Sequence, residues 1–442
     1  MDPRFRPVLH LARAFVRCGR GGQRQDAHSP VVPRRPAAHE LVRLTRHPAV
    51  SAPAAGSPAH VAPERRAARL RELAAVFLRL GLTAFGGPAA HIAMMEDEAV
   101  VRRHWLTPQR FLDLLGAANL LPGPSSSEMA IYLGYVRAGW LGLIVGGVCF
   151  VVPAALLVTA LAWMYTRFGA LPQTAGVLYG IRPVVVAIIV QAVWRLGRAG
   201  VKDVASVVVG VAASALSLAG LAPVAVLLVS GITIAVARGM RAVGTGSVPA
   251  LLPISPVVAA GAIGTPVTLP SVFLVFLKIG ALVFGSGYVL LAFLRADLVE
   301  RLHWLTEHQL LDAVAVGQVT PGPVFTTATF IGYLLAGWTG AAVATLAIFL
   351  PAFLLVAASG PFVPRLRRSR LVAMLLDGVT VGALALMAVV TWQLSRVAVV
   401  DLATAALLVA SAILLLRFRL SSTWLIVAGA GLGMILSIVR AH

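Results

Sequence analysis

Apolar runs about as long as a membrane-spanning helix recur along this chain and limit its fold more than any other feature. A helix needs about 20 apolar residues to cross about 30 Å of hydrocarbon. Runs near that length cover residues 139–164, 204–236, 341–359, 371–392 and 402–416. Of the 442 residues, 59% are hydrophobic and 12% are charged, which excludes an ordinary soluble globular protein. We therefore predict an all-α, polytopic integral membrane protein with roughly ten to twelve crossings or half-crossings.

The charge distribution indicates the type of membrane protein. The formal net charge is +20, which in a soluble domain would suggest a nucleic-acid partner. Here the basic residues lie in a leading tail and in short loops between apolar runs, as the positive-inside rule requires. We predict a multi-pass protein of the cell inner (plasma) membrane, surrounded by the lipid bilayer and without a nucleic-acid partner. The two cysteines, Cys18 and Cys149, indicate neither a disulfide framework nor a metal site, and no cofactor is expected.

An internal repeat divides the chain into two homologous halves. The stretch "FGGPAAHIAMMEDEAVVRRHWLTPQRFLDLLGAANLLPGP" begins at Phe85, and "FGSGYVLLAFLRADLVERLHWLTEHQLLDAVAVGQVTPGP" begins 199 residues later at Phe284. We assign residues 71–245 to the first repeat, 246–269 to a linker and 270–442 to the second repeat. Residues 1–70 are rich in Arg, Pro and Ala and cannot bury a core. We expect them to form a disordered basic tail, with binding to anionic lipid headgroups as the functional alternative.

The basic residues of matching loops predict how the two halves are oriented. In the first half, loops 165–172, 194–203, 219–221 and 237–244 carry 1, 3, 0 and 2 Lys or Arg residues. Their counterparts 363–370, 392–401, 417–419 and 435–442 carry 4, 1, 2 and 1. Basic loops stay on the cytoplasmic side, and here high and low counts alternate out of phase. We predict inverted repeats, an architecture found in many secondary transporters.

A Pro-Gly-Pro breaker interrupts an apolar stretch in each half. Proline removes a backbone hydrogen bond and clashes with the preceding turn, at about 3 kcal/mol in a helix interior. Irregular backbone at membrane depth is tolerated where it is buried in protein or lines a polar cavity. A helix that restarts after the breaker offers N–H groups, hydroxyl donors and the positive end of its dipole to an oxyanion. A hydroxyl-rich kink stabilised by local back-bonding is the structural alternative.

These segments supply most of the predicted substrate-binding residues, for a tetrahedral dianion held between the two restarts. A second feature adds one basic residue from the first span of each half, which could attract an anion, snorkel, or pair with a nearby carboxylate. The predicted set is Arg79, Asn119, Pro122, Gly123, Pro124, Ser125, Ser126, Ser127, Lys278, Gln318, Thr320, Pro321, Gly322, Pro323, Thr326 and Thr327.

Four carboxylates are candidates for carrying a coupling proton. Asp113 and Asp312 occupy matching positions in apolar helices that lead into the breakers, where capping or an ion pair with Arg110 is the structural alternative. Glu98 and Asp297 also match each other, and ordinary salt bridges to basic residues four positions later would explain them equally well. Glu128 has no acidic counterpart and would repel a dianion unless it is protonated.

No enzyme motif is present in the sequence. The chain lacks a GxxxxGK[ST] phosphate loop, an HExxH helix and a CxxC pair, and its glycine pairs have no βαβ context. These absences argue against an ATP-driven pump or a membrane enzyme. Transport without catalysis on this chain is the expected activity.

The motifs resemble those of the chromate ion transporter family in its long form of two fused domains. The resemblance rests on "FGGPAAHIAMMEDE", "LLPGPSSSEMAIYLGY", "FGSGYVLLAFLRADLVERLHWLT" and "GQVTPGPVFTTATFIGYLLAG" and covers about residues 71–440. It implies export of chromate from the cytoplasm driven by the proton motive force, and hence chromate resistance, with sulfate as a competing analogue. Uptake or exchange of sulfate or another tetrahedral oxyanion and an uncoupled anion channel are the alternatives, and a homodimer is left open.

Overall fold

The computed structural model describes residues 63–169, 171–242, 266–284, 287–359, 369–418 and 420–441, which are helical and contain no strand. Residues 1–62 of the predicted tail and 246–265 of the predicted linker lie outside the described residues. The first described helix begins at Pro63, so residues 63–70, which we assigned to the tail, are helical. Within these described ranges, five helices are long and apolar enough to cross a membrane, which supports the predicted multi-pass architecture.

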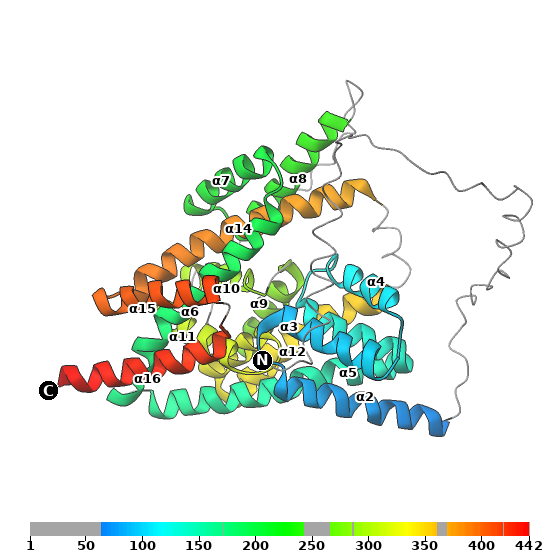
Figure 1. The fold of residues 1–442 in the computed structure, drawn as a ribbon, viewed down its shortest axis with the longest axis horizontal. Helices are drawn as coiled ribbons and strands as arrows, with labels where there is room; N and C mark the ends of the chain where they lie inside the picture. Colours follow the sequence, from blue (N-terminus) through cyan, green and yellow to red (C-terminus); the bar gives the residue numbers. More distant parts are fainter. Residues whose placement is uncertain are drawn as a thin grey trace, which may run out of the picture. The chain divides into compact units, whose positions relative to one another are not determined.

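The helices of the two halves follow one another in the same order (Figure 1). The first half contains α2 (Pro63–Thr83), α3 (Gly87–Glu96), η2 (Asp97–Arg102), α4 (Pro108–Ala118), α5 (Ser125–Phe168), α6 (Pro172–Gly200), α7 (Val204–Leu218) and α8 (Pro223–Ala242). The second contains α9 (Leu269–Leu282), α10 (Leu290–Leu294), η3 (Arg295–Arg301), α11 (Glu307–Val319), η4 (Val324–Thr326), α12 (Thr327–Ser359), α14 (Arg370–Ala398), α15 (Leu402–Ile413), η5 (Leu414–Phe418) and α16 (Ser422–Ala441).

A tight turn folds α5 back on itself, so the 44-residue helix is a hairpin of two helices. The turn lies at Ala138 and Gly139, where Gly139 has φ 65°. The arms pack without side chains between them, because Gly134 lies against the backbone of Gly142 and Ala130 against that of Gly146. The same turn occurs in α12 at Ala336 and Gly337. The apolar run 139–164 is therefore one arm of a hairpin.

The equivalent helices α6 and α14 run antiparallel, which makes the two halves inverted. The C-terminal end of α6 lies beside the N-terminal part of α14, where Lys202 pairs with Asp377 at 2.8 Å. At the opposite ends, the Tyr179 hydroxyl donates to Asp401 at 2.7 Å. Both helices are long enough to cross a membrane, so they cross in opposite directions. The charge pattern of the loops predicted this relation.

Polar loops close the end of α6 that faces the start of α14. Asp203 caps α7 and accepts hydrogen bonds from the hydroxyl and the backbone N–H of Ser206. These bonds, together with the Arg238 guanidinium, hold the pKa of Asp203 well below its ordinary value. Arg238 also pairs with Asp377 at 2.6 Å. One ion-pair network thus joins α7, α8 and α14.

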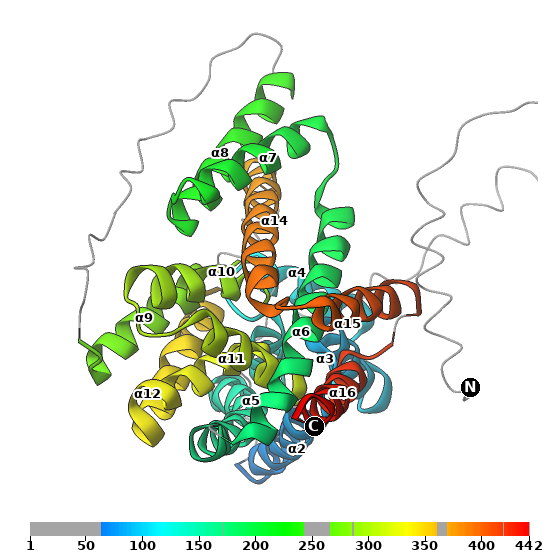
Figure 2. The same ribbon diagram turned by 90° about the vertical axis from the view of Figure 1, so that its left-hand side faces the viewer.

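The last two helices of each half pack against the other half. Figures 1 and 2 show α7 and α8 beside α14, while α15 and α16 lie against α6. Glycines allow the closest approaches, since a Cβ at Gly180 would overlap the carbonyl oxygen of Gly429. The equivalent contact brings Gly378 onto the backbone of Ser230 and Gly231. This exchange ties the halves into one body.

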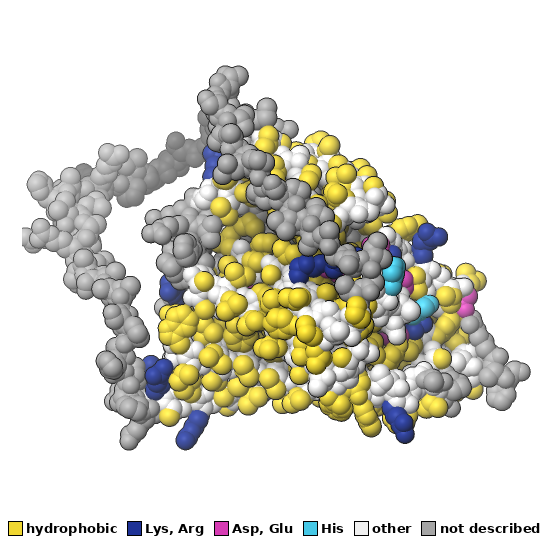
Figure 3. All heavy atoms as spheres, turned by 180° about the vertical axis from the view of Figure 1, so that it is seen from behind, with side chains coloured by type: hydrophobic (Ala, Val, Ile, Leu, Met, Phe, Trp, Pro, Cys, Tyr) yellow, Lys and Arg dark blue, Asp and Glu magenta, His cyan; other side chains and the backbone are white. Residues whose placement is uncertain are grey.

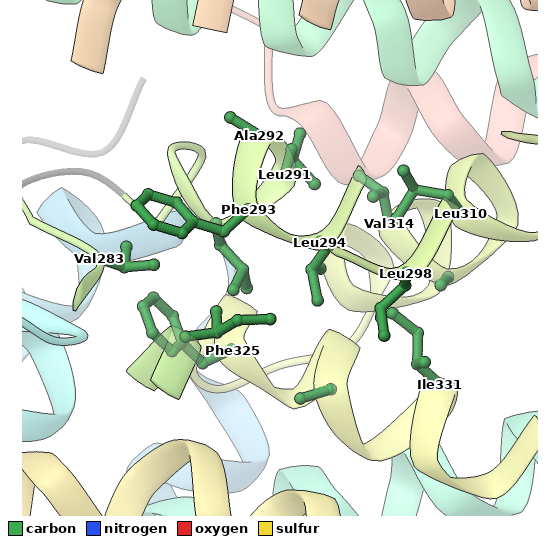
Figure 4. Close-up of a cluster of buried hydrophobic side chains, with 14 of the residues drawn as sticks. Val283, Leu291, Ala292, Phe293, Leu294, Leu298, Leu310, Val314, Phe325 and Ile331 are labelled. Carbon is green, nitrogen blue, oxygen red and sulfur yellow. The ribbon is translucent and has the colours of Figure 1, made fainter. Parts of the chain in front are cut away.

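Apolar side chains occupy both the interior and the outer surface. The interior cluster drawn in Figure 4 joins α10, α11 and α12 through residues such as Phe293, Val314 and Ile331. On the outside, Leu346 and Trp424 are 60% and 75% exposed. Figure 3 shows a face dominated by hydrophobic side chains with few charged ones among them. Such a surface suits lipid tails rather than water.

Candidate functional site

Both Pro-Gly-Pro segments break the helix, as the sequence predicts. In the first half, α4 ends at Ala118 and α5 begins at Ser125. In the second, α11 ends at Val319 and α12 begins at Thr327 after the short turn η4. The central glycines have φ 143° at Gly123 and 96° at Gly322, a region that side chains rarely adopt.

The two breakers lie where the halves meet, because each one bonds to the first helix of the other half. The Gly123 N–H donates to the carbonyl of Val283, at the end of α9, and the Gly322 N–H donates to Ala84, at the end of α2. The breaker glycines also face Ala352 and Ala154 in the long arms of α12 and α5. A pseudo-twofold relation therefore centres on the breakers.

A cavity of about 540 Å³ opens between the halves on one side of this region. The first half contributes the start of α3, the residues around the first breaker and the last turns of α6, and the second half contributes the chain before α10 and the middle of α14. The lining residues are Gly86, Gly87, Pro88, Ala89, Ile92, Asn119, Ser125, Gln191, Ala192, Arg195, Leu196, Phe284, Tyr288, Val289, Leu376, Val379, Thr380, Ala383, Leu384 and Met387.

The polar groups of this cavity are neutral side chains and one arginine, and the donors of Gln191, Tyr288 and Thr380 already bond to Leu415, Gln318 and Leu376. Asn119 and Ser125, both predicted from sequence, line it together with Gln191, Tyr288 and Thr380. The first turns of α3 and α5 also open into it, and the first four N–H groups of a helix have no acceptor within the helix. No carboxylate is among the described lining residues. The cavity therefore favours an anion over a cation.

Arg195 is the one cationic side chain among the described lining residues, and it is not among the residues predicted from sequence. It lies near the end of α6 and has an electrostatic interaction with Tyr288, on the opposite wall. In the sequence it is one of the three basic residues of loop 194–203, which we interpreted as a topology signal. Its position in an apolar helix, far from either breaker, gave no sign that α6 reaches the site.

The other predicted polar residues near the breakers do not line the cavity. Gln318 is buried and accepts a hydrogen bond from Tyr288 at 3.3 Å, so it contacts the cavity wall from behind. The hydroxyls of Thr320, Thr326 and Thr327 donate to backbone carbonyls of their own segment. This is the back-bonding alternative. The remaining predicted residues that are buried without lining the cavity are Ser126, Ser127, Gly123, Pro124, Pro321, Gly322 and Pro323, while Pro122 is half-buried.

The two basic residues of the first spans form ion pairs away from the cavity lining. Arg79 pairs with Glu98, and Lys278 pairs with Asp297 at 2.5 Å. These pairs were the structural alternative to an anion-attracting role. Two of the four candidate proton carriers are therefore held by cations in equivalent places of the two halves.

Asp312 is held by a bidentate ion pair in the interior. Its side chain is 1% exposed, and both carboxylate oxygens accept hydrogen bonds from Arg182 at 2.9 Å. The Tyr165 hydroxyl donates a third bond at 2.9 Å. The matching carboxylate Asp113 is half-buried on α4 and also has an interaction partner. In the described ranges, no group of three His, Cys, Asp or Glu residues has the spacing of a metal site.

Comparison with known proteins identifies the family. The sequence model of the chromate transporter family matches residues 71–235 and 270–434, once in each half. The chain is 37% identical over 393 residues to a chromate transport protein of Cupriavidus metallidurans, covering 86% of this chain and 95% of that one. It is 35% identical over 349 residues to a chromate transport protein of Pseudomonas aeruginosa, covering 74% and 81%.

A relative of half the architecture also matches. An uncharacterized transporter of Bacillus subtilis, YwrA, is 34% identical over 128 residues, which cover 29% of this chain and 72% of that protein. No solved structure matches. The two matched regions and the relatives of nearly full length agree, and the chain belongs to the chromate transporter family.

Proposed function

We propose that this protein exports chromate from the cytoplasm, driven by the proton motive force, and thereby confers chromate resistance. The cavity between the inverted halves is the proposed binding site. Its lining combines one guanidinium with the N-terminal turns of two helices, and the described lining contains no carboxylate. This combination is the observation that carries the proposal, because a doubly charged oxyanion leaving water needs donors from several directions.

Five parts of the chain would hold the anion. Arg195 supplies the full positive charge, and the first turns of α3 and α5 supply N–H groups and the positive ends of their dipoles. Asn119 and Ser125 lie at the breaker, and Tyr288, whose hydroxyl donates to Gln318, forms part of the wall from the second half. Because the lining comes from both halves, a relative movement of the halves changes access to the site, as alternating access requires.

The membrane potential supports the outward direction. Each elementary charge that crosses 100 mV is worth about 2.3 kcal/mol, so a dianion leaving a negative cytoplasm gains about 4.6 kcal/mol. Uptake would require more than two coupled cations to offset the same field. Export needs no such compensation.

Sulfate is the natural competitor at this site. Amide, hydroxyl and guanidinium donors recognise the charge and the tetrahedral shape of an anion. Sulfate and chromate share both properties. An uncoupled channel would present the same lining groups, but its flux would follow voltage and ignore the proton gradient. Coupling therefore separates a channel from a transporter.

Uptake of chromate into everted membrane vesicles tests the proposal. We expect accumulation by the wild type that falls when a protonophore collapses the proton gradient and the membrane potential with it, and a loss of accumulation in a Pro124→Ala/Pro323→Ala double variant. Competition by added sulfate measures selectivity in the same assay. Equal accumulation with and without the gradient, in wild type and variant alike, contradicts coupled transport through this site.

A further inference from the structure

Glu128 is a buried carboxyl group that the binding site described above does not use. It lies in the first turn of α5, directly after the breaker, and its side chain is 0% exposed. Neither carboxylate oxygen has a hydrogen-bond partner in the described part of the chain. The breaker covers it closely, since a Cβ at Gly123 would lie 2.6 Å from Oε1 of Glu128. An ionised carboxylate without a cation is costly in such surroundings, so the charge of Glu128 is sensitive to a further negative charge nearby.

Glu128 lies directly behind the cavity. Ser125, Glu128 and Tyr132 are three and four residues apart, which places them on one face of α5. Ser125 lines the cavity, and Glu128 follows about one helical turn further along the axis. One turn beyond, the hydroxyls of Tyr132 and Ser359 are hydrogen-bonded at 2.6 Å. A single line of polar groups thus runs from the cavity into the protein past Glu128.

Apart from Tyr132, the titratable groups near Glu128 interact with other residues. Tyr132, on the same helix, interacts electrostatically with Glu128. On the inner parts of the helices that pack against α5, every titratable group has a partner of its own. They are Glu72 and Arg79 on α2, His91 on α3, Asp113 on α4 and Asp312 on α11. On α12, the described residues carry no charged side chain.

We propose that Glu128 binds one proton whenever the cavity binds a dianion and releases it when the cavity empties. The inference rests on the proposed function and adds to it the residue that couples anion and proton. An ionised Glu128 one turn behind Ser125 would repel a doubly negative ion, whereas a neutral Glu128 would not. Anion affinity and proton affinity therefore rise together, and this linkage is reciprocal.

The second half has no equivalent acid. Thr326 and Thr327 follow the second breaker at the corresponding distance, and their hydroxyls donate to their own backbone. One chain therefore carries one such proton. A dianion that leaves with one proton still moves one net negative charge outward, so the membrane potential drives export, while an inward proton gradient opposes the exit of the proton.

Chromate binding to the purified protein, measured in alkaline buffer where chromate is fully deprotonated, tests this coupling. For the wild type we expect uptake of about one proton per chromate bound, and an affinity that falls about tenfold for each unit of rising pH. Glu128→Gln, a neutral isostere, should bind chromate without proton uptake and with an affinity independent of pH. Glu128→Asp should keep the pH dependence. Asp113→Asn, a matched control on α4, should behave as the wild type does.

The outcomes separate this inference from the proposed function. Absence of chromate binding by the wild type contradicts the proposed function itself. Binding without proton uptake and without pH dependence in the wild type overturns the role of Glu128, whether or not the Gln variant folds. Proton uptake that persists in Glu128→Gln, or that disappears in Asp113→Asn instead, also overturns it.

Discussion

The backbone N–H of Gly123 donates a 2.8 Å hydrogen bond to the carbonyl of Val283, and the equivalent pair, Gly322 and Ala84, is joined at 2.9 Å. Each half thus ends its first helix on the breaker of the other half. The reciprocal bonds fix the interrupted segments at the interface between halves, and the cavity opens beside them. If the halves move so that access to the cavity changes, these two hydrogen bonds must be kept or replaced by others.

A side chain at Gly123 should damage the site more than the same change at another strained glycine. Gly123→Ala places a methyl group 2.6 Å from Oε1 of Glu128 and forces alanine into a positive φ, at about 1–2 kcal/mol for the backbone alone. Gly139→Ala is the control, since Gly139 has φ 65° and nothing within 4 Å of a Cβ. We expect chromate uptake to fall strongly in Gly123→Ala and less in Gly139→Ala. Equal uptake in the two variants would remove the steric argument.

Neutralising Arg195 should weaken chromate binding. A charge-assisted hydrogen bond contributes about 1.5–3 kcal/mol, so Arg195→Gln should raise the Kd for chromate by about 10- to 100-fold. Arg198→Gln is the control, because its guanidinium lies over the Trp194 ring and outside the cavity lining. Isothermal titration calorimetry or a filter-binding assay gives both constants. An unchanged Kd in Arg195→Gln argues that the anion binds elsewhere.

Substitutions in the buried ion pair of Arg182 and Asp312 should affect the stability of the protein first. Removing one partner leaves the other charge buried and costs about 3–5 kcal/mol, so Arg182→Met should lower the Tm sharply. The double variant Arg182→Met/Asp312→Leu should recover much of this loss, since apolar replacement of a buried pair is often neutral or stabilising. If the double variant is stable and still transports with proton coupling, Asp312 is not the proton carrier that its sequence position suggested.

The exchanged packing of the last helices can be tested within one helix. Gly433→Ala should lower the Tm, because a Cβ there would overlap the backbone of Gly176 and Gly180 on α6. Gly431→Ala has nothing within 4 Å and should raise helix stability by up to about 1 kcal/mol. Thermal unfolding in detergent measures both. Similar Tm values for the two variants would argue against the close approach of α16 and α6.

The ion pairs of the first spans predict effects on folding rather than on affinity. Lys278→Gln leaves Asp297 with only Arg301 as a cationic partner, at 3.1 Å. We expect a lower Tm and an unchanged chromate Kd, and the same for Arg79→Gln. A large rise in Kd with an unchanged Tm would restore the anion-attracting role for these residues.

Features that depend on local backbone chemistry were predictable from the sequence. The breaks at Pro122–Pro124 and Pro321–Pro323 follow from the missing N–H and fixed φ of proline, whatever surrounds them. The inverted relation of the halves was readable from loop charges, since these record topology directly. Asn119 and Ser125 were selected because they adjoin a break and carry donors, and both line the cavity.

Features that depend on contacts between distant segments were not predictable. Arg195 lines the cavity because α6 packs against α14. No local sequence pattern predicts a contact between these two distant helices. The threonines after the second breaker look like donors in the sequence, but back-bonding to their own turn removes them from the site. The sequence places the start of an apolar run at Gly139, but nothing in the Ala-Gly pair shows that the chain turns back there.

The position of the bound anion tests the central claim most directly, and chromium makes that position visible. An anomalous difference map collected at the chromium absorption edge, from crystals grown with chromate, locates the ion independently of the protein model. We predict one peak in the cavity between the Arg195 guanidinium and the first turn of α5. A peak beside the ion pair of Lys278 and Asp297, with none in the cavity, would contradict the account.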